Sequence, residues 1–193
     1  METWRLLDTP PMTAAENMAL DEALVELKGR GGTPNTIHFL QFSPRAVLVG
    51  FHQSLAEEIR LDYCRTHGID INRRVTGGGA IFFDESQLGW EVVCHKGFFD
   101  VKMPNNRLFR HLCDPVVLAL QGLGIEASFR PRNDIEVNGR KISGTGGTES
   151  DDAFLFQGTM LTDFDVDTML RSLRIPVEKL KAKEIDSVKE RVT

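Results

Sequence analysis

Residues 71–86 read INRRVTGGGAIFFDES and place two arginines and three consecutive glycines between segments typical of β-strands. A glycine inside a strand pattern costs backbone entropy and leaves no side chain to pack. An uninterrupted run therefore indicates that another group must approach the backbone closely. We expect strands at 70–75 and 80–83, joined by a glycine loop.

A second glycine-rich stretch ends the segment RNDIEVNGRKISGTGG, residues 132–147. Its Asn138-Gly139 pair predicts a two-residue hairpin turn, because both positions must accept positive φ. Such a turn fixes the register and predicts the pairs Val137–Arg140, Glu136–Lys141, Ile135–Ile142 and Asp134–Ser143. Alternation then gathers polar side chains on one face of the hairpin: Asp134, Glu136, Lys141 and Ser143.

Cations precede glycines twice in this chain, at 73–79 and at 141–147. Positive side chains beside exposed backbone N–H groups suit a bound anion. Neither stretch matches GxxxxGK[ST] or completes GxGxxG, so a nucleotide site here is of another type. The alternative for the hairpin is a solvated edge, on which Glu136 and Lys141 form a cross-strand ion pair of modest value.

The composition is that of an ordinary globular protein, with 193 residues, 41% hydrophobic and 26% charged. We expect one domain. A net charge of -5 argues against nucleic acid as a partner. The amino terminus lacks a targeting pattern and no apolar run is long enough to span a membrane, which predicts a cytoplasmic protein without a membrane partner. The three cysteines have no CxxC spacing and are expected to be buried packing residues.

Local signals predict several further elements. Thr13 and Glu16 form a capping box for a helix that ends near Gly29, and Ser54 with Glu57 predicts another that runs to Gly68. The apolar runs 36–42 and 46–51, separated by Ser-Pro-Arg, are interpreted as a hairpin. A helical pattern at 105–124 contains Pro115, which is expected to kink the helix or restart it. The mixture predicts α/β or α+β architecture.

The chain resembles the lipoate-protein ligase A family, in the wider group that includes octanoyl transferases and biotin-protein ligases. The resemblance covers nearly the whole chain. It is carried by WRLLDTPPMTAAENMALDEAL (4–24), RRVTGGGAIFFD (73–84), RNDIEVNGRKISG (132–144) and QGTML (157–161). It implies a mixed central β-sheet flanked by helices, within a single catalytic domain spanning residues 1–193. Ligases of this kind often have an accessory region, which would be a separate subunit or lie outside this chain.

The activity that the resemblance implies is ATP-dependent: lipoate or octanoate is activated as acyl-AMP and transferred to a lysine of an acceptor protein. The acceptor would be a lipoyl domain, an H-protein-like protein or a specialised lipoate-binding protein. Lys141 is the implied catalytic residue, which contacts both the acyl carboxylate and the α-phosphate. Nucleotide contacts would come from Arg74, Gly79, Ala80, Ile81, Phe82 and Lys141. Acyl contacts would come from His52, Arg73, Gly77, Gly78, Ser143 and Gly144. The triphosphate implies Mg²⁺, for which Asp134 is the candidate ligand, with a structural hydrogen-bonding role as the alternative.

Three positions depart from the family pattern. The arginine-glycine motif of the family commonly ends in His-Asp, where this chain has Phe83 before Asp84, and Gln157 stands where a histidine commonly precedes Gly-Thr. Gly146-Gly147 replaces a common Ala-Gln. These departures argue against any mechanism that needs a histidine at either place.

Three other functions stay open. The first is an acyl transferase that uses acyl carrier protein, although its cysteine-dependent members need a nucleophile near 127–134, where this chain has Ser128 and no cysteine. The second is a biotin ligase, whose glycine motif has interspersed arginines that are absent here. The third is a non-catalytic acyl-binding partner subunit, against which the retained Lys141 and Arg74 count.

Overall fold

The computed structural model of the chain describes residues 3–99, 105–163 and 165–174. Its larger sheet has seven strands and is antiparallel except where β1 and β2 run parallel. In order across the sheet the strands are β1 (Trp4–Asp8), β2 (Asn35–Leu40), β6 (Leu88–His95), β10 (Ala153–Met160), β9 (Arg140–Ser150), β8 (Asp134–Val137) and β7 (Ala127–Arg130).

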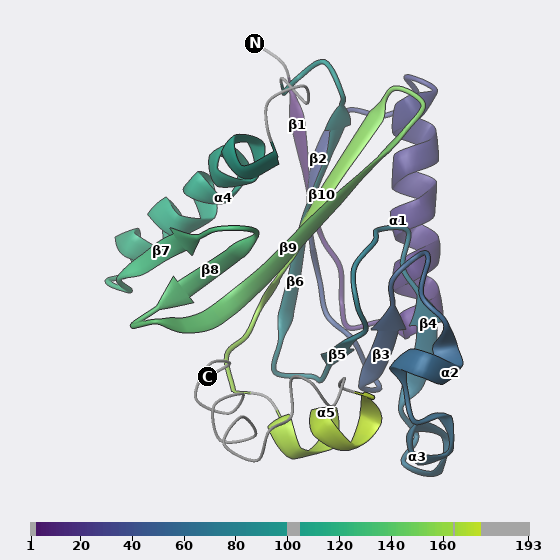
Figure 1. Ribbon diagram of the computed structural model, residues 1–193. Coiled ribbons are helices and arrows are strands. Elements are labelled where there is room, and N and C mark those ends of the chain that lie inside the picture. Colours follow the sequence, from purple (N-terminus) through teal and green to yellow (C-terminus); the bar gives the residue numbers. More distant parts are fainter. Residues whose placement is uncertain (1–2, 100–104, 164, 175–193) are drawn as a thin grey trace.

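A smaller three-stranded sheet lies beside the lower end of the larger one (Figure 1). Its order is β4 (Asp70–Arg73), β3 (Ala46–Val49) and β5 (Ile81–Phe83), with β3 parallel to β4 and antiparallel to β5. The helices are α1 (Ala14–Gly29), α2 (Leu55–Glu58), α3 (Leu61–Thr66), α4 (Asn105–Gly122) and α5 (Val166–Ser172). The predicted mixed sheet flanked by helices is confirmed.

Helices cover both faces of the larger sheet, α4 on one side and α1 on the other (Figure 1). Leu108, Leu112 and Val117 of α4 pack against Trp90 and Phe156 of the sheet. On the opposite face Leu24 and Val25 of α1 pack with Val93, Ala153 and Leu155. Among the described residues, no helix is both long and apolar enough to cross a membrane.

The first helix begins as predicted, with a complete capping box between Thr13 and Glu16. Its buried face includes two polar residues, Asn17 and Asp21. Asn17 Nδ2 donates to the carbonyls of Met12 and Gln41, whereas its buried Oδ1 has no hydrogen-bond partner. Asp21 lines the pocket described below.

The predicted hairpin between 36–42 and 46–51 is wrong. Strand β2 lies between β1 and β6 in the larger sheet, whereas β3 is the central strand of the smaller one. All four residues of β3 are buried, with Val47 and Val49 in one apolar cluster and Ala46 and Leu48 in another. A continuous apolar run is typical of a strand covered on both faces. Because β3 is buried on both faces in the smaller sheet, it does not pair with β2.

The helix predicted from Ser54 to Gly68 is also different. Ser54 makes no side-chain cap, and the segment forms two short helices that are interrupted at Ile59 and Arg60. Ile59 forms a bridge with Leu173, and the N–H of Arg60 donates to the Ser172 carbonyl. These contacts with the end of α5 outweigh local helix propensity. By contrast, α4 continues through Pro115 without a restart.

Candidate active site

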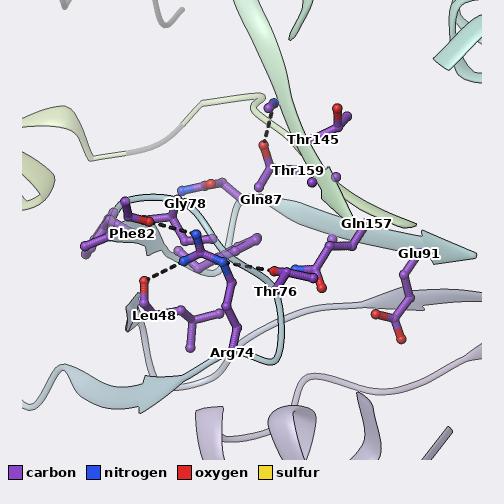
Figure 2. Close-up of a pocket in the computed structure, with 18 of the residues that line it drawn as sticks. Leu48, Arg74, Thr76, Gly78, Phe82, Gln87, Glu91, Thr145, Gln157 and Thr159 are labelled. Atoms are coloured by element: carbon purple, nitrogen blue, oxygen red, sulfur yellow. Dashed lines mark hydrogen bonds between the residues drawn. The ribbon is translucent and has the colours of Figure 1, made fainter. Parts of the chain in front are cut away.

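A pocket of about 370 Å³ has the glycine loop, defined here as residues 74–80, on one side and the larger sheet on the other. Figure 2 shows Arg74, Thr76 and Gly78 facing Gln157 and Thr159 of β10 across this space. The larger part of the predicted site lines the pocket: Arg74, Gly77, Gly78, Gly79, Ala80, Ile81, Phe82, Lys141 and Gly144. The two motifs, some sixty residues apart, thus meet at one cavity.

Two cross-strand rows form the sheet side of the pocket. One row pairs His38 with Glu91, Glu91 with Gln157, and Gln157 with Gly146. The next row pairs Leu40 with Gly89 and Gly89 with Thr159, whose Oγ1 accepts a hydrogen bond from the N–H of Gly144 at 3.2 Å. Among the glycines of these rows, Gly146 leaves open space, because a Cβ there would meet nothing within 4 Å. The space beside Gly89 and Gly144 is taken by the side chains of Leu40 and Lys141.

Arg74 organises the glycine loop from within. It is 5% exposed, and its guanidinium donates to the carbonyls of Leu48, Gly77 and Gly79 and to Oγ1 of Thr76 (Figure 2). Burial lowers the pKa of Arg74 to about 10, so the side chain stays charged at neutral pH. Its main visible role is to hold the loop in shape and to bring a positive charge to the pocket wall.

A close contact within the protein requires glycine at position 50, and the backbone conformation of Gly78 favours glycine there. A Cβ built on Gly50 would lie only 1.9 Å from the carbonyl oxygen of Gly78, and Gly78 itself has a φ of 100°. The end of β3 and the glycine loop therefore touch backbone to backbone. The sequence pattern indicated a close approach, but it did not identify Gly50 as the neighbour.

One amide of the predicted nucleotide-binding segment already contacts an anion. The N–H of Ala80 donates to Oε2 of Glu58, on α2, at 2.9 Å. A carboxylate in this position demonstrates that the end of the glycine loop presents a donor suited to an anionic oxygen. The backbone carbonyl of Glu58 in turn accepts a hydrogen bond from the N–H of Arg174.

Lys141 lies in an ion-pair cluster at the edge of the pocket. Its Nζ is 2.8 Å from Oδ1 of Asp134, whereas Oδ2 of Asp134 is 2.8 Å from Arg130. Arg130 also contacts Glu136 at 3.2 Å. Both oxygens of Asp134 are thus engaged by cations in this structure, which agrees with the alternative, structural role for this residue.

The hairpin register agrees with the prediction near the turn and differs beyond it. Glu136 pairs with Lys141 as expected, but an irregularity between Ile135 and Glu136 pairs Ile135 with Ser143 and Asp134 with Gly144. The extra residue moves Ser143 to the buried face, where its hydroxyl is inaccessible and has no hydrogen-bond partner. Ser143 does not line the pocket, contrary to the polar face that the sequence predicted.

Two other predicted acyl contacts lie outside the pocket. Nη1 of Arg73 donates to the carbonyls of Gly50, Phe51 and Gln53 at 2.8 to 2.9 Å, which secures the turn after β3. His52 is exposed within this turn, with its ring against that of Phe51. Neither residue lines the cavity, and Arg73 stabilises the loop beside it.

The residues that depart from the family pattern lie in different environments. Phe83 is a buried core residue that packs on Phe42, with ring centroids 4.6 Å apart, and it also lines the pocket. Gln157 lines the pocket with its Oε1 buried and unpartnered. Gly146 lines it as well, and a Cβ there would meet nothing within 4 Å. Gly147, by contrast, is closely packed, because a Cβ there would lie 3.0 Å from the carbonyl oxygen of Leu155.

Several polar residues of the pocket were missed by sequence reasoning: Asp21, Gln87, Trp90 and Glu91. Gln87 is fully buried and neither atom of its amide has a partner; Nε1 of Trp90 is likewise unpartnered. A weak signal was available, because Glu91 interrupts the apolar strand pattern of GWEVV with a charge. Buried unpaired polar atoms are uncommon in proteins and indicate ligand or solvent contacts.

The three cysteines are buried, as predicted, and none lines the pocket. Burial raises the pKa of Cys64, and it raises the pKa of Cys113 to about 11. Ser128 is exposed on β7, opposite Glu136, and does not line the pocket. The structure therefore brings no activated thiol to Lys141.

Comparison with known proteins gives consistent matches. Residues 13–193 match the lipoyl protein ligase A/B catalytic domain. An octanoyltransferase LipM from Symbiobacterium thermophilum is 33% identical, over 95% of this chain and 76% of that protein. A solved structure of a bi-partite lipoate protein ligase and its E2 lipoyl domain from Thermoplasma acidophilum has a TM-score of 0.81 and 33% identity, covering 100% of this chain and 74% of the other. A lipoate-protein ligase A bound with ATP has a TM-score of 0.75 and 29% identity, covering 100% of this chain and 76% of the other.

These matches confirm the resemblance noted in the sequence, and they extend across both the glycine loop and the lysine hairpin that form the pocket. The chain belongs to the lipoyl protein ligase A/B catalytic domain family.

Proposed function

We propose that this chain is an ATP-dependent lipoate-protein ligase that activates lipoate or octanoate as acyl-AMP and transfers the acyl group to a lysine of an acceptor protein. The observation that carries the proposal is the convergence of Lys141 with the glycine loop on one pocket. A solved relative described as lipoate-protein ligase A bound with ATP supports it.

The first step would join two anions. A carboxylate oxygen of the acid attacks the α-phosphorus of ATP, and pyrophosphate leaves. Lys141 would lie between the carboxylate and the α-phosphate and offset their repulsion, while the backbone N–H groups of the glycine loop contact phosphate oxygens. The charge of Arg74 behind the loop adds to this stabilisation. Catalysis would thus rest on positioning and electrostatics.

In the second step the amine of an acceptor lysine attacks the carbonyl carbon of the acyl-AMP. The C–O bond to the phosphate breaks, AMP leaves as an anion, and the amine proton passes to solvent. Lys141 is held at the edge of the pocket by Asp134 and can remain paired with the departing phosphate.

Magnesium would enter with the triphosphate, which supplies most of its oxygen ligands. Asp134 is engaged by Lys141 and Arg130, and the reaction steps above do not require a metal at that residue. The acceptor would be a lipoyl domain, and a separate accessory subunit would complete the enzyme. The similarity to a bi-partite ligase from Thermoplasma acidophilum, whose structure was solved with its E2 lipoyl domain, supports both expectations.

The second candidate is an octanoyl transferase that takes its acyl group from a carrier protein without ATP. The similarity to octanoyltransferase LipM favours it. A thiol mechanism would need a reactive cysteine, and the three cysteines of the chain are buried and do not line the pocket. The ligase is therefore the better-supported proposal.

The test supplies the purified chain with an acceptor lipoyl domain and, in parallel reactions, a candidate accessory subunit. One set contains ATP, Mg²⁺ and either lipoate or octanoate; the other contains octanoyl carrier protein without ATP. A ligase releases pyrophosphate and increases the acceptor mass only in the first set. A mass gain only in the second set identifies a transferase, and no turnover with every partner present identifies a binding subunit.

A further inference from the structure

A buried cluster of one histidine and two carboxylates adjoins the inner end of the pocket. Asp21 of α1, His38 of β2 and Glu91 of β6 are each no more than 1% exposed, and each offers a ligand atom within 4.8 Å of the others. Asp21 and Glu91 also line the pocket, so the cluster can be reached from it.

His38 contacts a polar neighbour through each of its ring nitrogens. Nε2 lies 3.0 Å from Oγ1 of Thr9, and Nδ1 lies 2.7 Å from Oε1 of Glu91. Without an ion, the short contact with Glu91 holds a shared proton, and a cation bound by both atoms would take its place.

The carboxyl groups of Asp21 and Glu91 also contact each other. Oδ1 of Asp21 has no hydrogen-bond partner although the residue is buried. Burial raises the pKa of both acids, that of Glu91 to about 7, and lowers the pKa of His38. The charged groups of the adjacent strand β1, Arg5 and Asp8, have opposite signs and provide no net counter-charge.

We propose that Asp21, His38 and Glu91 bind a divalent transition-metal cation of the Zn²⁺ type. Nδ1 of His38 and one oxygen of each carboxylate would be the protein ligands, with solvent at a fourth position toward the pocket. One imidazole with two carboxylates is a donor set that favours Zn²⁺ or Mn²⁺ over Mg²⁺, which rarely takes imidazole.

The geometry needs only small adjustments. A tetrahedral ion with bonds near 2.1 Å separates its donors by roughly 3.4 Å. The three ligand atoms lie within 4.8 Å of one another, so their separations would change by at most about 1.4 Å. Thr9 would act as the outer partner of the metal-ligating histidine, because its Oγ1 lies 3.0 Å from the ring nitrogen that does not bind the ion. The cation would replace the shared proton and neutralise two buried acids.

Such a site would connect α1, β2 and β6 and make the inner wall of the pocket rigid. It is independent of the proposed ligase reaction, because none of its ligands is assigned a role in that mechanism.

The test begins with protein stripped by a chelator and dialysed. Isothermal titration with Zn²⁺, Mn²⁺ or Mg²⁺ and metal analysis by mass spectrometry then report affinity and stoichiometry. We expect one Zn²⁺ per chain, a higher melting temperature on binding, and at least about 100-fold weaker binding of Mg²⁺. Wild-type protein that binds no Zn²⁺ stoichiometrically, or that binds it no better than Mg²⁺, overturns the proposal.

Asp21→Asn and His38→Gln should lose the site. The matched control is Glu22→Gln, which changes the exposed neighbour of Asp21 and should bind Zn²⁺ like the wild type. Thr9→Val keeps all three ligands and should weaken binding about tenfold or more, which covers the case in which the ligand variants fail to fold. Unchanged affinity in His38→Gln and Thr9→Val would assign the bound ion to another part of the chain.

Discussion

Nζ of Lys141 and Oδ1 of Asp134 lie 2.8 Å apart on adjacent strands, and the second oxygen of Asp134 contacts Arg130 at the same distance. This carboxylate therefore positions two cations at the edge of the pocket. The Lys141 side chain is 33% exposed, so it can leave or share this contact when an anionic ligand arrives.

Lys141→Ala should lower the rate of acyl-adenylate formation by on the order of 10³-fold, because it removes the charge between the two reacting anions. The fold should be retained, since the side chain is partly exposed. Pyrophosphate release and circular dichroism measure the two effects. Lys96→Ala, which removes an exposed lysine paired with Asp152, is the control. A Lys141→Ala enzyme that worked at the parent rate would refute the assigned role.

Asp134→Asn should lower the rate less than Lys141→Ala, by about tenfold, because the ammonium remains but is no longer held by a charged partner. The Mg²⁺ concentration needed for half-maximal rate should not change, since both Asp134 oxygens are engaged by cations. A clear increase in that concentration would instead assign Asp134 as a magnesium ligand.

Arg74→Lys should destabilise the protein by roughly 2–4 kcal/mol, because a lysine cannot make the paired contacts to the Gly77 and Gly79 carbonyls and leaves buried acceptors unsatisfied. Denaturant unfolding measures the loss, and the KM for ATP should rise as the loop loosens. Arg65→Lys, at an exposed position of α3, should be neutral. Equal stability of the two variants would contradict the role of Arg74.

Gly50→Ala should disturb the glycine loop, since its Cβ would lie 1.9 Å from the backbone of Gly78. We expect a lower melting temperature together with loss of nucleotide binding, measured by thermal unfolding with and without ATP. Gly122→Ala is the matched control, because a Cβ there meets nothing within 4 Å. Equal stabilisation of both variants by ATP would show that the glycine loop tolerates a side chain at position 50, and the prediction would be wrong.

The native protein should react slowly with thiol reagents at pH 8. The pKa of Cys113 is raised to about 11, so only a small fraction is thiolate at that pH, and the fraction grows as the pH rises. Cys64 and Cys94 are buried as well. Mass spectrometry after brief alkylation, with the unfolded protein as the positive control, measures this. Rapid labelling of one cysteine in the native protein would favour the alternative function, a thiol-dependent transferase.

The lysine hairpin illustrates how much of a strand register a local sequence pattern can predict. The Asn-Gly turn determined the pairs next to it, including Glu136 with Lys141, because register close to a two-residue turn is set by the turn itself. Beyond the irregularity at Ile135 the same alternation failed, and Ser143 lies on the opposite face from the one expected. The position of a bulge depends on packing against neighbouring strands, and the sequence of the two hairpin strands alone does not specify that packing.

The apolar runs at 36–42 and 46–51 provide the opposite case. Both were identified as strands, yet they belong to different sheets, because each has better partners far away in the sequence. Residues such as Asp21 and Glu91 were assigned no role for a similar reason. Their carboxylates approach one another only when α1 packs on the larger sheet.

The sequence by itself determined the family, the mixed α/β class and the two motifs at Arg74 and Lys141, because these depend on residue identity and on spacing along the chain. Tertiary structure alone decided that Gly50 contacts the glycine loop, that Asp134 bridges two cations, and that Asp21, His38 and Glu91 form one buried cluster. Those relationships depend on burial and on pairing between distant strands and helices, and no local periodicity specifies them.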